Sequence, residues 1–378
     1  MSQIRKIHLD SLPRDKLFIV LGDNFRKELF KRLYKKIGGS TILSRIIKNV
    51  KNEEVRRWKT GKRSIPLYAL IKLVKLLNNG FSVNEIEKYI IAYRGKSSKN
   101  AIFRPNLPLI EDERLIRFVT HIMCDGYDGG KTHGPSYANT EKSLVDAIEK
   151  DLECFGKVNT KMRHRVQKNR KKIYLLEMPR IITYIIRKIY KINFRSKKVR
   201  LPKEFFNHPP YLAYQVIKAF ADDESSVGEH CICFLSVNKK FLNDIRKLLI
   251  LRVPGIKRKG ITKTKYKPHS KCYEFRINRD NLPQFYKYVN YTHPNKKQKL
   301  LFILNRSQTT GNKFPKGVAK EIILDLLSKK QMTSNELAFE LGIKPKNVRY
   351  HLFNLERDKK VGRMNKVSNY SVIWSVKK

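Results

Sequence analysis

Two acidic residues, each following an apolar helical stretch, are the features of this sequence that could carry out chemistry. Asp125 comes after the stretch 115–124, and Glu224 lies 99 positions later, after the stretch 212–221. A carboxylate at the C-terminal end of a helix opposes the helix dipole, so stability alone does not favour either placement. Two carboxylates brought together need a cation, and Mg²⁺ or Mn²⁺ accepts carboxylate, water and phosphate oxygens. We therefore expect metal-dependent hydrolysis of a phosphodiester, with Asp125 and Glu224 as metal ligands.

The elements that must position these acids follow each of them in the same order. Residues 108–205 and 206–308 each fit the order α-β-β-α-β-β-α, beginning with the helix that carries the acid. Such mutual register indicates a duplicated fold, so we expect two α+β units related by a pseudo-two-fold axis. One motif alone would be better explained by an exposed helix-end acid before a turn, because Asp-Gly is a common turn sequence. The duplication favours a paired site.

The two helix ends also carry sequence motifs. Residues 118–126 (FVTHIMCDG) and 217–225 (IKAFADDES) resemble the paired motifs of single-chain LAGLIDADG homing endonucleases, with an acid at the catalytic position of each. The resemblance implies that the motif helices pack against each other, that metal ions lie between the acids, and that each repeat lays β-strands in the DNA major groove. Ser225 stands where the family has a closing glycine, and His121 and Lys218 are unusual inside such helices.

The resemblance further implies a basic residue of each repeat near the reacting water. Lys172, before the strand IYLLEM, and Lys271, before CYEFRI, hold comparable places in the two repeats and are the catalytic candidates. The alternative is that both are phosphate contacts among many, and this is the interpretation that their basic surroundings favour.

A large basic excess limits the partners of this chain. The 378 residues include 82 Lys and Arg against 33 Asp and Glu, a formal net charge of +49, in segments apolar enough to fold. Such a charge indicates a polyanion partner, because phosphates attract it through counterion release. No uniformly apolar run reaches membrane-spanning length, so we expect nucleic acid and no membrane. On the basic strands of the core, the candidate DNA contacts are Arg163, Arg165, Lys168, Lys263, Lys265 and Lys267.

Residues 1–100 have helical periodicity and contain a second motif. Residues 54–66 resemble the recognition helix and exit loop of Cro-like helix-turn-helix domains, in which Val55 and Trp58 would anchor the helix to its core. The alternative is an ordinary amphipathic helix with a solvated charged face. If the resemblance holds, the helix enters the major groove. Its candidate DNA contacts are Arg56, Arg57, Lys59 and Arg63.

Residues 312–378 resemble a winged helix-turn-helix. Thr333 or Ser334 can cap a helix, Gly342 makes the turn, and Pro345 suits the first turn of a recognition helix. An alternating basic hairpin follows as the wing. The candidate DNA contacts of this domain are Lys346, Asn347, Arg349 and Tyr350.

The cysteines indicate a reducing compartment and do not indicate a disulfide-bonded fold. Five scattered cysteines in a long chain argue for a reducing intracellular environment, the cytoplasm or nucleoid. Cys231 and Cys233 lie in an alternating stretch, where both side chains share one strand face, and we expect them to pack in the core.

Together these features predict an α+β protein with a pseudo-two-fold duplicated αββαββα LAGLIDADG core between a helical helix-turn-helix domain and a winged-helix domain. The expected function is site-specific, metal-dependent cleavage of both strands of a long duplex DNA target by a monomer of homing-endonuclease type. Two alternatives stay open. A non-cleaving transcription regulator could retain the core for its groove-fitting sheets, and an intron RNA maturase could use the same fold on RNA.

Overall fold

A computed structural model describes most of the chain, which divides into two compact units. Unit 1 comprises residues 1–226 and 232–294, and unit 2 comprises 227–231 and 295–378. The described residues are 4–47, 50–77, 82–96, 101–127, 129, 134–166, 172–194, 198–256, 260–267, 270–307, 317–368 and 371–376. Lys168 lies outside them, as do the side chains of Lys265, Lys267 and Lys271.

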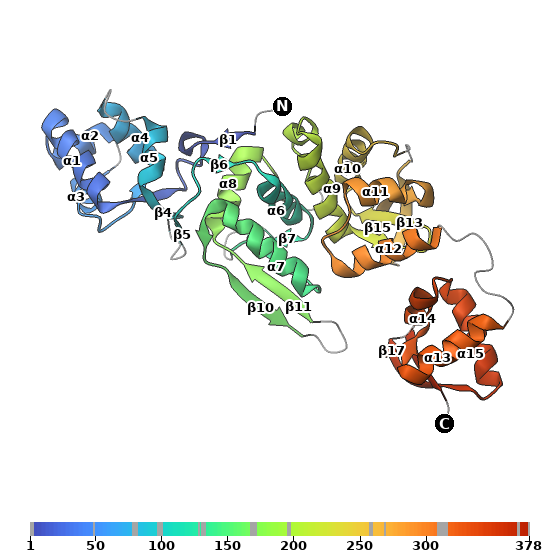
Figure 1. The fold of residues 1–378 in the computed structure, drawn as a ribbon. Helices are drawn as coiled ribbons and strands as arrows, with labels where there is room; N and C mark the ends of the chain where they lie inside the picture. The colour runs from blue at the N-terminus through green and yellow to red at the C-terminus, as the bar shows by residue number, and fades with distance from the viewer. Residues whose placement is uncertain are drawn as a thin grey trace. The chain divides into compact units, whose positions relative to one another are not determined.

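A group of helices opens unit 1 (Figure 1). Val55 and Trp58 are buried, as expected of residues that anchor their helix to a core. Pro66 is the residue immediately before α4, at its N-cap position. The helices are α1 (Asp23–Ile37), α2 (Ser40–Ile47), α3 (Asn52–Lys59), α4 (Leu67–Leu76) and α5 (Val83–Ile86).

Short strands, which the helical pattern of residues 1–100 did not predict, complete this region. They form a five-stranded sheet in the order β3-β2-β4-β5-β9. The last of these strands belongs to the first repeat, so the N-terminal region and that repeat share one sheet. A second pairing, between β1 and β6, also joins them. The strands are β1 (Lys6–Ile7), β2 (Phe18–Leu21), β3 (Ile65–Pro66), β4 (Ile90–Arg94), β5 (Ile102–Phe103), β6 (Leu109–Ile110) and β9 (Lys157–Val158).

The two repeats have the predicted order of elements. Their sheets run β7-β8-β11-β10 and β12-β13-β15-β14, so each strand of one repeat has a counterpart at the same place in the other. This confirms the α+β class and the duplicated αββαββα plan. The first repeat contains α6 (Glu113–Cys124), β7 (Gly126–Tyr127), β8 (Ser136–Asn139), α7 (Lys142–Asp151), β10 (Lys161–Arg165), β11 (Ile173–Glu177) and α8 (Arg180–Tyr190). The second contains α9 (Pro210–Glu224), β12 (Ser225–Val227), β13 (Cys231–Ser236), α10 (Lys239–Arg252), β14 (Thr262–Lys267), β15 (Ser270–Asn278) and α11 (Leu282–Tyr288).

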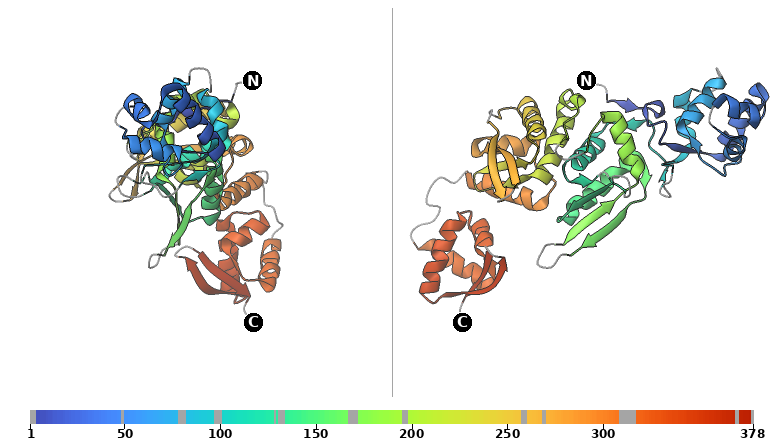
Figure 2. Two further views of the ribbon diagram at one scale, coloured as in Figure 1. Left: turned by 90° about the vertical axis from the view of Figure 1, so that its left-hand side faces the viewer. Right: turned by 180° about the vertical axis from the view of Figure 1, so that it is seen from behind.

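Helices cover one face of each sheet, and α7 lies along the sheet of the first repeat in both views (Figures 1 and 2). Tyr137 and Leu176 are fully buried on the covered face of the first sheet. On the second sheet, Phe234 stacks on Phe275 with 4.6 Å between ring centroids. Because successive residues of a strand point to opposite faces, these buried residues identify the covered side of each sheet and, with it, the open side.

The two cysteines of β13 lie on the open side of their sheet. Ile232 and Phe234 are fully buried, whereas Cys231 and Cys233 are half-buried. The prediction that the cysteines share one face is confirmed, but the prediction that this face is the core is wrong. Strand alternation determines which residues share a face, and the helices that pack on the sheet determine which face they cover.

Helices α6 and α9 pack against each other in the same direction. Gln215 donates a hydrogen bond to Glu113, and His121 bonds to Asp223, and both pairs are 102 positions apart in the sequence. The register is therefore constant along the interface. Parallel packing brings the C-terminal ends of both helices, and the acids that follow them, to the same end of the interface.

Unit 2 contains a winged helix. Thr333 caps α14 through a capping box with Glu336, Gly342 ends that helix with φ of +62°, and Pro345 opens α15, as the sequence predicts. The sheet of the wing has the order β16-β18-β17. The elements are α12 (Pro294–Ser307), α13 (Val318–Lys329), β16 (Met332–Thr333), α14 (Ser334–Leu341), α15 (Pro345–Arg357), β17 (Val361–Ser368) and β18 (Ser371–Val376).

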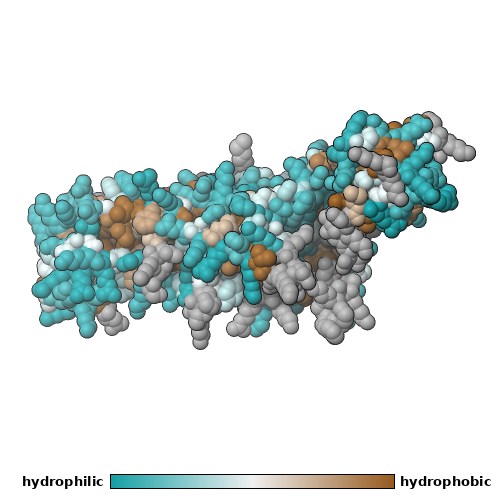
Figure 3. Space-filling model, turned by 90° about the horizontal axis from the view of Figure 1, so that it is seen from below, coloured by the Kyte–Doolittle hydropathy of each residue, from teal (hydrophilic) through white to brown (hydrophobic). Residues whose placement is uncertain are grey.

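One face of the molecule is largely hydrophilic. On the face drawn in Figure 3, hydrophilic residues cover most of the area, with smaller apolar patches between them. Among the described residues, no helix is both long enough and apolar enough to cross a membrane.

Candidate nucleic-acid interface

The two predicted catalytic acids lie at the C-terminal ends of α6 and α9, but their backbone conformations differ. Asp125 is the residue after the last turn of α6, with φ of −104° and ψ of 5°, and it is exposed. Glu224 is still the last helical residue of α9, and it is half-buried. The structure brings both acids to the same end of the helix pair, but it does not hold them in equivalent positions.

The residue that follows each acid explains this difference. A Cβ atom at Gly126 would lie 2.4 Å from the carbonyl oxygen of Ile122, so only glycine fits the path of the chain there. Ser225 cannot follow that path and is extended instead, with φ of −123° and ψ of 161°. Its buried hydroxyl donates to the carbonyl of Ala221 at 2.6 Å and bonds to the hydroxyl of Tyr291 at 2.9 Å. Ser225 thus closes the end of α9 as a structural residue.

A buried polar network lies between the two helices, next to the acids. Nδ1 of His121 is 2.9 Å from Oδ2 of Asp223, and the hydroxyl of Tyr137 donates to Oδ1 of the same carboxylate at 2.6 Å. Burial lowers the pKa of His121 to about 4, so the ring is neutral near pH 7. A carboxylate only accepts, and the Nδ1–H of the neutral ring therefore donates to Asp223. The side chain of Asn139 extends the network to Tyr137 at 3.1 Å.

The third acid of the second motif is also buried within the fold. Asp222 accepts hydrogen bonds from the backbone N–H groups of Thr292 and His293, the shortest at 2.9 Å. Burial raises the pKa of Asp222. Asp222 and Asp223 are therefore committed to the fold. Asp125 acts electrostatically on both His121 and Tyr137, so it lies close to the buried network.

Of the two lysines predicted near the reacting water, only Lys172 has a side chain within the described part of the structure. Lys172 is exposed just before β11, and its ammonium lies 5.2 Å from the centre of the Tyr174 ring. Lys271 lies on β15 opposite Lys265 of β14. Its side chain falls outside the described part, so its catalytic role stays a prediction.

The open face of the first sheet is basic, as expected of a surface that binds DNA. The register pairs Arg163 with Leu175 and Arg165 with Ile173, on the face opposite the buried Leu176 and Tyr137. Both arginines are exposed, and Arg163 is 3.2 Å from the carboxylate of Glu177. The hairpin of β10 and β11 carries this face and extends as a long two-stranded ribbon (Figures 1 and 2).

The second sheet differs in where its basic residues lie. Lys263 pairs with Tyr273, two residues from the buried Phe275, which places it on the helix-covered side of the sheet, although it is exposed there. On the open side, Glu274 accepts a hydrogen bond from Cys233 at 3.3 Å and forms an ion pair with Arg276 at 2.8 Å. The two sheets thus present different charges to a ligand.

In the N-terminal region, α3 presents charged residues opposite its buried face. Arg57 pairs with Glu53 at 3.1 Å, and Arg63 forms an ion pair with Glu54. The ammonium of Lys59 lies 4.4 Å from the centre of the Tyr34 ring. Arg56, which is exposed, reaches back to the hydroxyl of Ser40 on α2 at 3.4 Å.

In the winged helix, the exposed face of α15 combines cations and aromatic rings. Residues of an α-helix are spaced by about 100°, so the positions opposite the buried Val348 and Leu352 are those of Lys346, Tyr350, Phe353 and Arg357. Asn347 and Arg349, which are exposed, flank this face. Phe353 is not among the contacts predicted from the sequence, although its spacing of three from Tyr350 is a signal that can identify it.

Arg363 of the wing is fixed against the same helix. Its guanidinium lies 5.3 Å from the ring of Phe353 and 5.4 Å from the ring of Trp374, and it also bonds to Glu356 at 2.8 Å. Stacking of this kind holds a planar cation in place without burying it. The recognition helix and the wing therefore form one continuous basic and aromatic surface.

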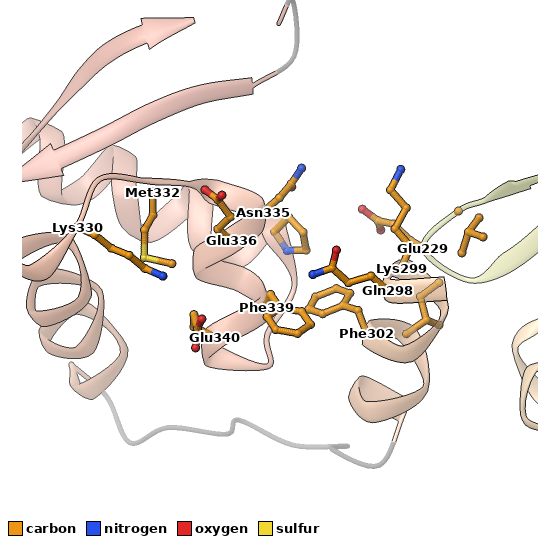
Figure 4. Close-up of a pocket in the computed structure, with 14 residues that line it drawn as sticks. Glu229, Gln298, Lys299, Phe302, Lys330, Met332, Asn335, Glu336, Phe339 and Glu340 are labelled. Carbon is orange, nitrogen blue, oxygen red and sulfur yellow. The ribbon is translucent and has the colours of Figure 1, made fainter. Parts of the chain in front are cut away.

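A cavity of about 570 Å³ lies in unit 2, between α12 and α14 (Figure 4). Phe302 and Phe339 face each other across it, with ring centroids 5.8 Å apart. Of the side chains described around it, none belongs to the predicted catalytic or DNA-binding residues. The cavity therefore plays no part in the candidate interface.

Comparisons with known proteins found one family model for the C-terminal part and several solved structures of low similarity. Residues 320–358, which include α14 and α15, match the model of the bacterial regulatory protein arsR family. No curated protein matches the sequence. Among solved structures, the chain is similar to I-DmoI in complex with DNA and Mn, at 10% identity over 47% of this chain and 96% of that one, with a TM-score of 0.34.

Two further solved structures are similar to the chain. The homing endonuclease I-WcaI bound to its DNA recognition sequence is similar at 13% identity, over 50% of this chain and 85% of that one, with a TM-score of 0.36. Full-length DUF199/WhiA from Thermatoga maritima is similar at 11% identity, over 66% of this chain and 92% of that one, with a TM-score of 0.37. The assignment of the LAGLIDADG-like core rests on the strand order and the parallel helix pair described above.

Proposed function

We propose that this chain is a sequence-specific binder of double-stranded DNA whose LAGLIDADG-like core serves binding and not cleavage. The observation that carries the proposal is the unequal ends of α6 and α9. A pseudo-two-fold site for phosphodiester hydrolysis needs its two carboxylates in matching positions, since each faces one strand of the duplex. Here Asp125 lies beyond its helix and Glu224 lies within its helix, because Ser225 cannot take the path of Gly126.

Three surfaces support DNA binding. The open face of β10 and β11 carries exposed arginines, α3 presents a charged face, and α15 joins the wing in a basic and aromatic face. The net charge of +49 supplies the long-range attraction to phosphates. We propose that the modules 1–100, 108–205, 206–308 and 312–378 act together, as a monomer, on one long site or on neighbouring sites.

Cleavage is the second candidate, and one observation favours it. Both acids are present at the same end of the helix pair, where Asp125 acts on the network that holds Asp223, the neighbour of Glu224. Mg²⁺ or Mn²⁺ would be held by the carboxylates of Asp125 and Glu224, with water and phosphate oxygens at the other positions. When bound, the ion would supply charge stabilisation for hydrolysis. Among the described residues, no group of three or more His, Cys, Asp or Glu side chains could hold a metal ion.

The test is selection of bound DNA from a random duplex pool, followed by incubation of the selected DNA with Mg²⁺ or Mn²⁺. We expect one sequence class to be enriched and to stay intact on denaturing gels. Asp125→Asn and Glu224→Gln should bind it as the unmodified protein does. Cutting by the unmodified protein that is lost in both variants would establish the nuclease instead. A folded intron RNA that outcompetes the selected duplex would favour the maturase alternative.

A further inference from the structure

Glu53 lies at the centre of the outward face of α3. The helix is held by Val55 and Trp58, which are 0% and 2% exposed, and consecutive residues are spaced by about 100° around it. The direction opposite these two anchors lies about 10° from Glu53 and from Thr60. Arg57 lies about 50° to one side of it and Arg56 about 50° to the other. The side chains of Glu53 and Arg57 are 57% and 50% exposed. A helix docked by its outward face would place this carboxylate deepest in the groove.

The other polar residues of α3 have partners within the fold, although Arg56 and Lys59 are also exposed. Asn52 donates to the hydroxyl of Thr41 at 3.1 Å, and Arg56 donates to the hydroxyl of Ser40 at 3.4 Å. Glu54 is engaged with Arg63 and is 29% exposed. Glu53 and Arg57 are thus the pair that this helix offers to a ligand.

Stability explains the acid at this position only in part. Glu53 lies in the first turn of α3, where a carboxylate interacts favourably with the helix dipole, but at an exposed position this interaction is weak. An exposed ion pair four residues apart on a helix contributes little to folding. In a chain of net charge +49, a carboxylate facing DNA is repelled by the phosphates and lowers non-specific affinity. A carboxylate in the major groove has one favourable partner among the base edges, the N4 amino group of cytosine, whereas an arginine matches O6 and N7 of guanine.

We propose that Glu53 and Arg57 read bases in the major groove, Glu53 accepting a hydrogen bond from the amino group of a cytosine and Arg57 donating to a guanine. This inference rests on the proposed DNA binding. Four residues of helix rise by about 6 Å, which spans roughly two base-pair steps of about 3.4 Å each. The two bases therefore belong to the same or neighbouring steps, and the recognised half-site contains a cytosine and a guanine within about two positions.

The ion pair itself supports this assignment. Nε of Arg57 lies 3.1 Å from Oε1 of Glu53, so the two side chains restrain each other before any ligand binds. The second carboxylate oxygen and the terminal guanidinium nitrogens remain for base edges, since one Nε–Oε1 contact leaves those donors and acceptors unused.

The experiment is DNA selection and quantitative binding with the full chain, its Glu53→Gln variant and a matched control, Glu28→Gln. Glu28 is an exposed acid in the same region and forms the same kind of pair, with Arg32 at 2.7 Å on α1. The unmodified protein should enrich a cytosine near a guanine, and replacing that cytosine should weaken binding roughly ten-fold. Glu53→Gln keeps one acceptor oxygen and should lose only part of this penalty. A further variant, Glu53→Ala, removes the acceptor, so its penalty should fall below three-fold, while affinity for random duplex rises in both variants. Glu28→Gln should keep the full penalty.

Two results would overturn the inference. If Glu53→Ala keeps the sequence preference of the unmodified protein, or tightens binding to every sequence by the same factor, Glu53 is only a repulsive surface charge. If the unmodified protein binds no duplex at all, the proposed function fails, and the inference fails with it. The first outcome leaves DNA binding intact, so the two failures are distinguishable.

Discussion

Nδ1 of His121 on α6 lies 2.9 Å from Oδ2 of Asp223 on α9, and both side chains are at most 1% exposed. The pair links the first repeat to the second at the end of the interface where the two acids lie. Because Asp223 also accepts from Tyr137, one carboxylate satisfies two buried donors from the other repeat. The stability of the core therefore depends on a polar contact inside an otherwise apolar helix pair.

Removing this carboxylate should destabilise the core strongly. Asp223→Ala leaves the donors of His121 and Tyr137 buried without an acceptor, and we expect each unsatisfied donor to lower the free energy of unfolding by about 1–3 kcal/mol. Asp223→Asn, which keeps an acceptor, should lose less. Urea denaturation of the full chain measures both. The control is Asp146→Ala, which removes an exposed pair with Lys142 and should change stability by less than about 0.5 kcal/mol. Equal effects at the two sites would contradict this account.

The buried histidine should make stability depend on pH. Burial lowers the pKa of His121 to about 4, below the usual value near 6.5, so the unfolded state binds the extra proton first. Stability should therefore fall as the pH decreases from about 6.5 to about 4, by roughly 3 kcal/mol for this one group. The comparison is between the unmodified protein and His121→Gln, because buried carboxylates such as Asp222 have a raised pKa and act in the opposite direction. The difference in free energy of unfolding between the unmodified protein and His121→Gln should decrease as the pH falls. A difference that is the same at every pH would refute the lowered pKa of His121.

Gly126 should be intolerant of any side chain. A Cβ atom there would lie 2.4 Å from the carbonyl oxygen and 2.5 Å from the Cα of Ile122, which are backbone atoms that cannot move independently. Gly126→Ala should lower the melting temperature and destabilise the core by about 2 kcal/mol or more. Gly228→Ala is the matched control, since its new Cβ would lie 3.6 Å from the nearest atom. A melting temperature that stays the same in Gly126→Ala would show that the chain can take another path after α6.

The open face of the first sheet should contribute to DNA binding through phosphates. Arg163→Ala and Arg165→Ala should each weaken binding to all sequences by a similar factor. Each should also reduce the slope of log affinity against log salt concentration by about 1. Lys142→Ala, on α7, removes the same charge elsewhere and should leave the slope unchanged. A change of sequence preference without a change of slope would mean that the arginines contact bases.

The sequence predicts those parts of this protein that repeat or that follow local rules. The plan of the two repeats could be read from matching patterns, and the caps of α14 and α15 from single residues such as Thr333 and Gly342. The strands of the N-terminal region could not be predicted in this way. Strands of two to five residues, such as Ile65–Pro66, are too short to show a periodicity and form only against a partner strand.

The polar network between α6 and α9 could not be predicted from the sequence either. His121 was recognised as unusual in its helix, but its partner lies 102 positions away and is chosen by the packing register. The side of the sheet on which Lys263 lies depends on how β14 pairs with β15, a one-residue choice that reverses the face of every side chain. The same limit explains why Cys231 and Cys233 were placed on the wrong face.

The pairing of β5 with β9 has a consequence for how the chain is made. Ile102 and Phe103 complete the N-terminal sheet against Lys157 and Val158, which emerge from the ribosome some fifty residues later. Until those residues are synthesised, the sheet has an unpaired edge, and an unpaired edge can associate with other chains. The first module therefore lacks one strand of its sheet until the repeat that follows has begun to be made. A gene fragment that stops between Phe103 and Lys157 should leave β5 exposed as the edge strand and aggregate more readily than one that continues through Val158.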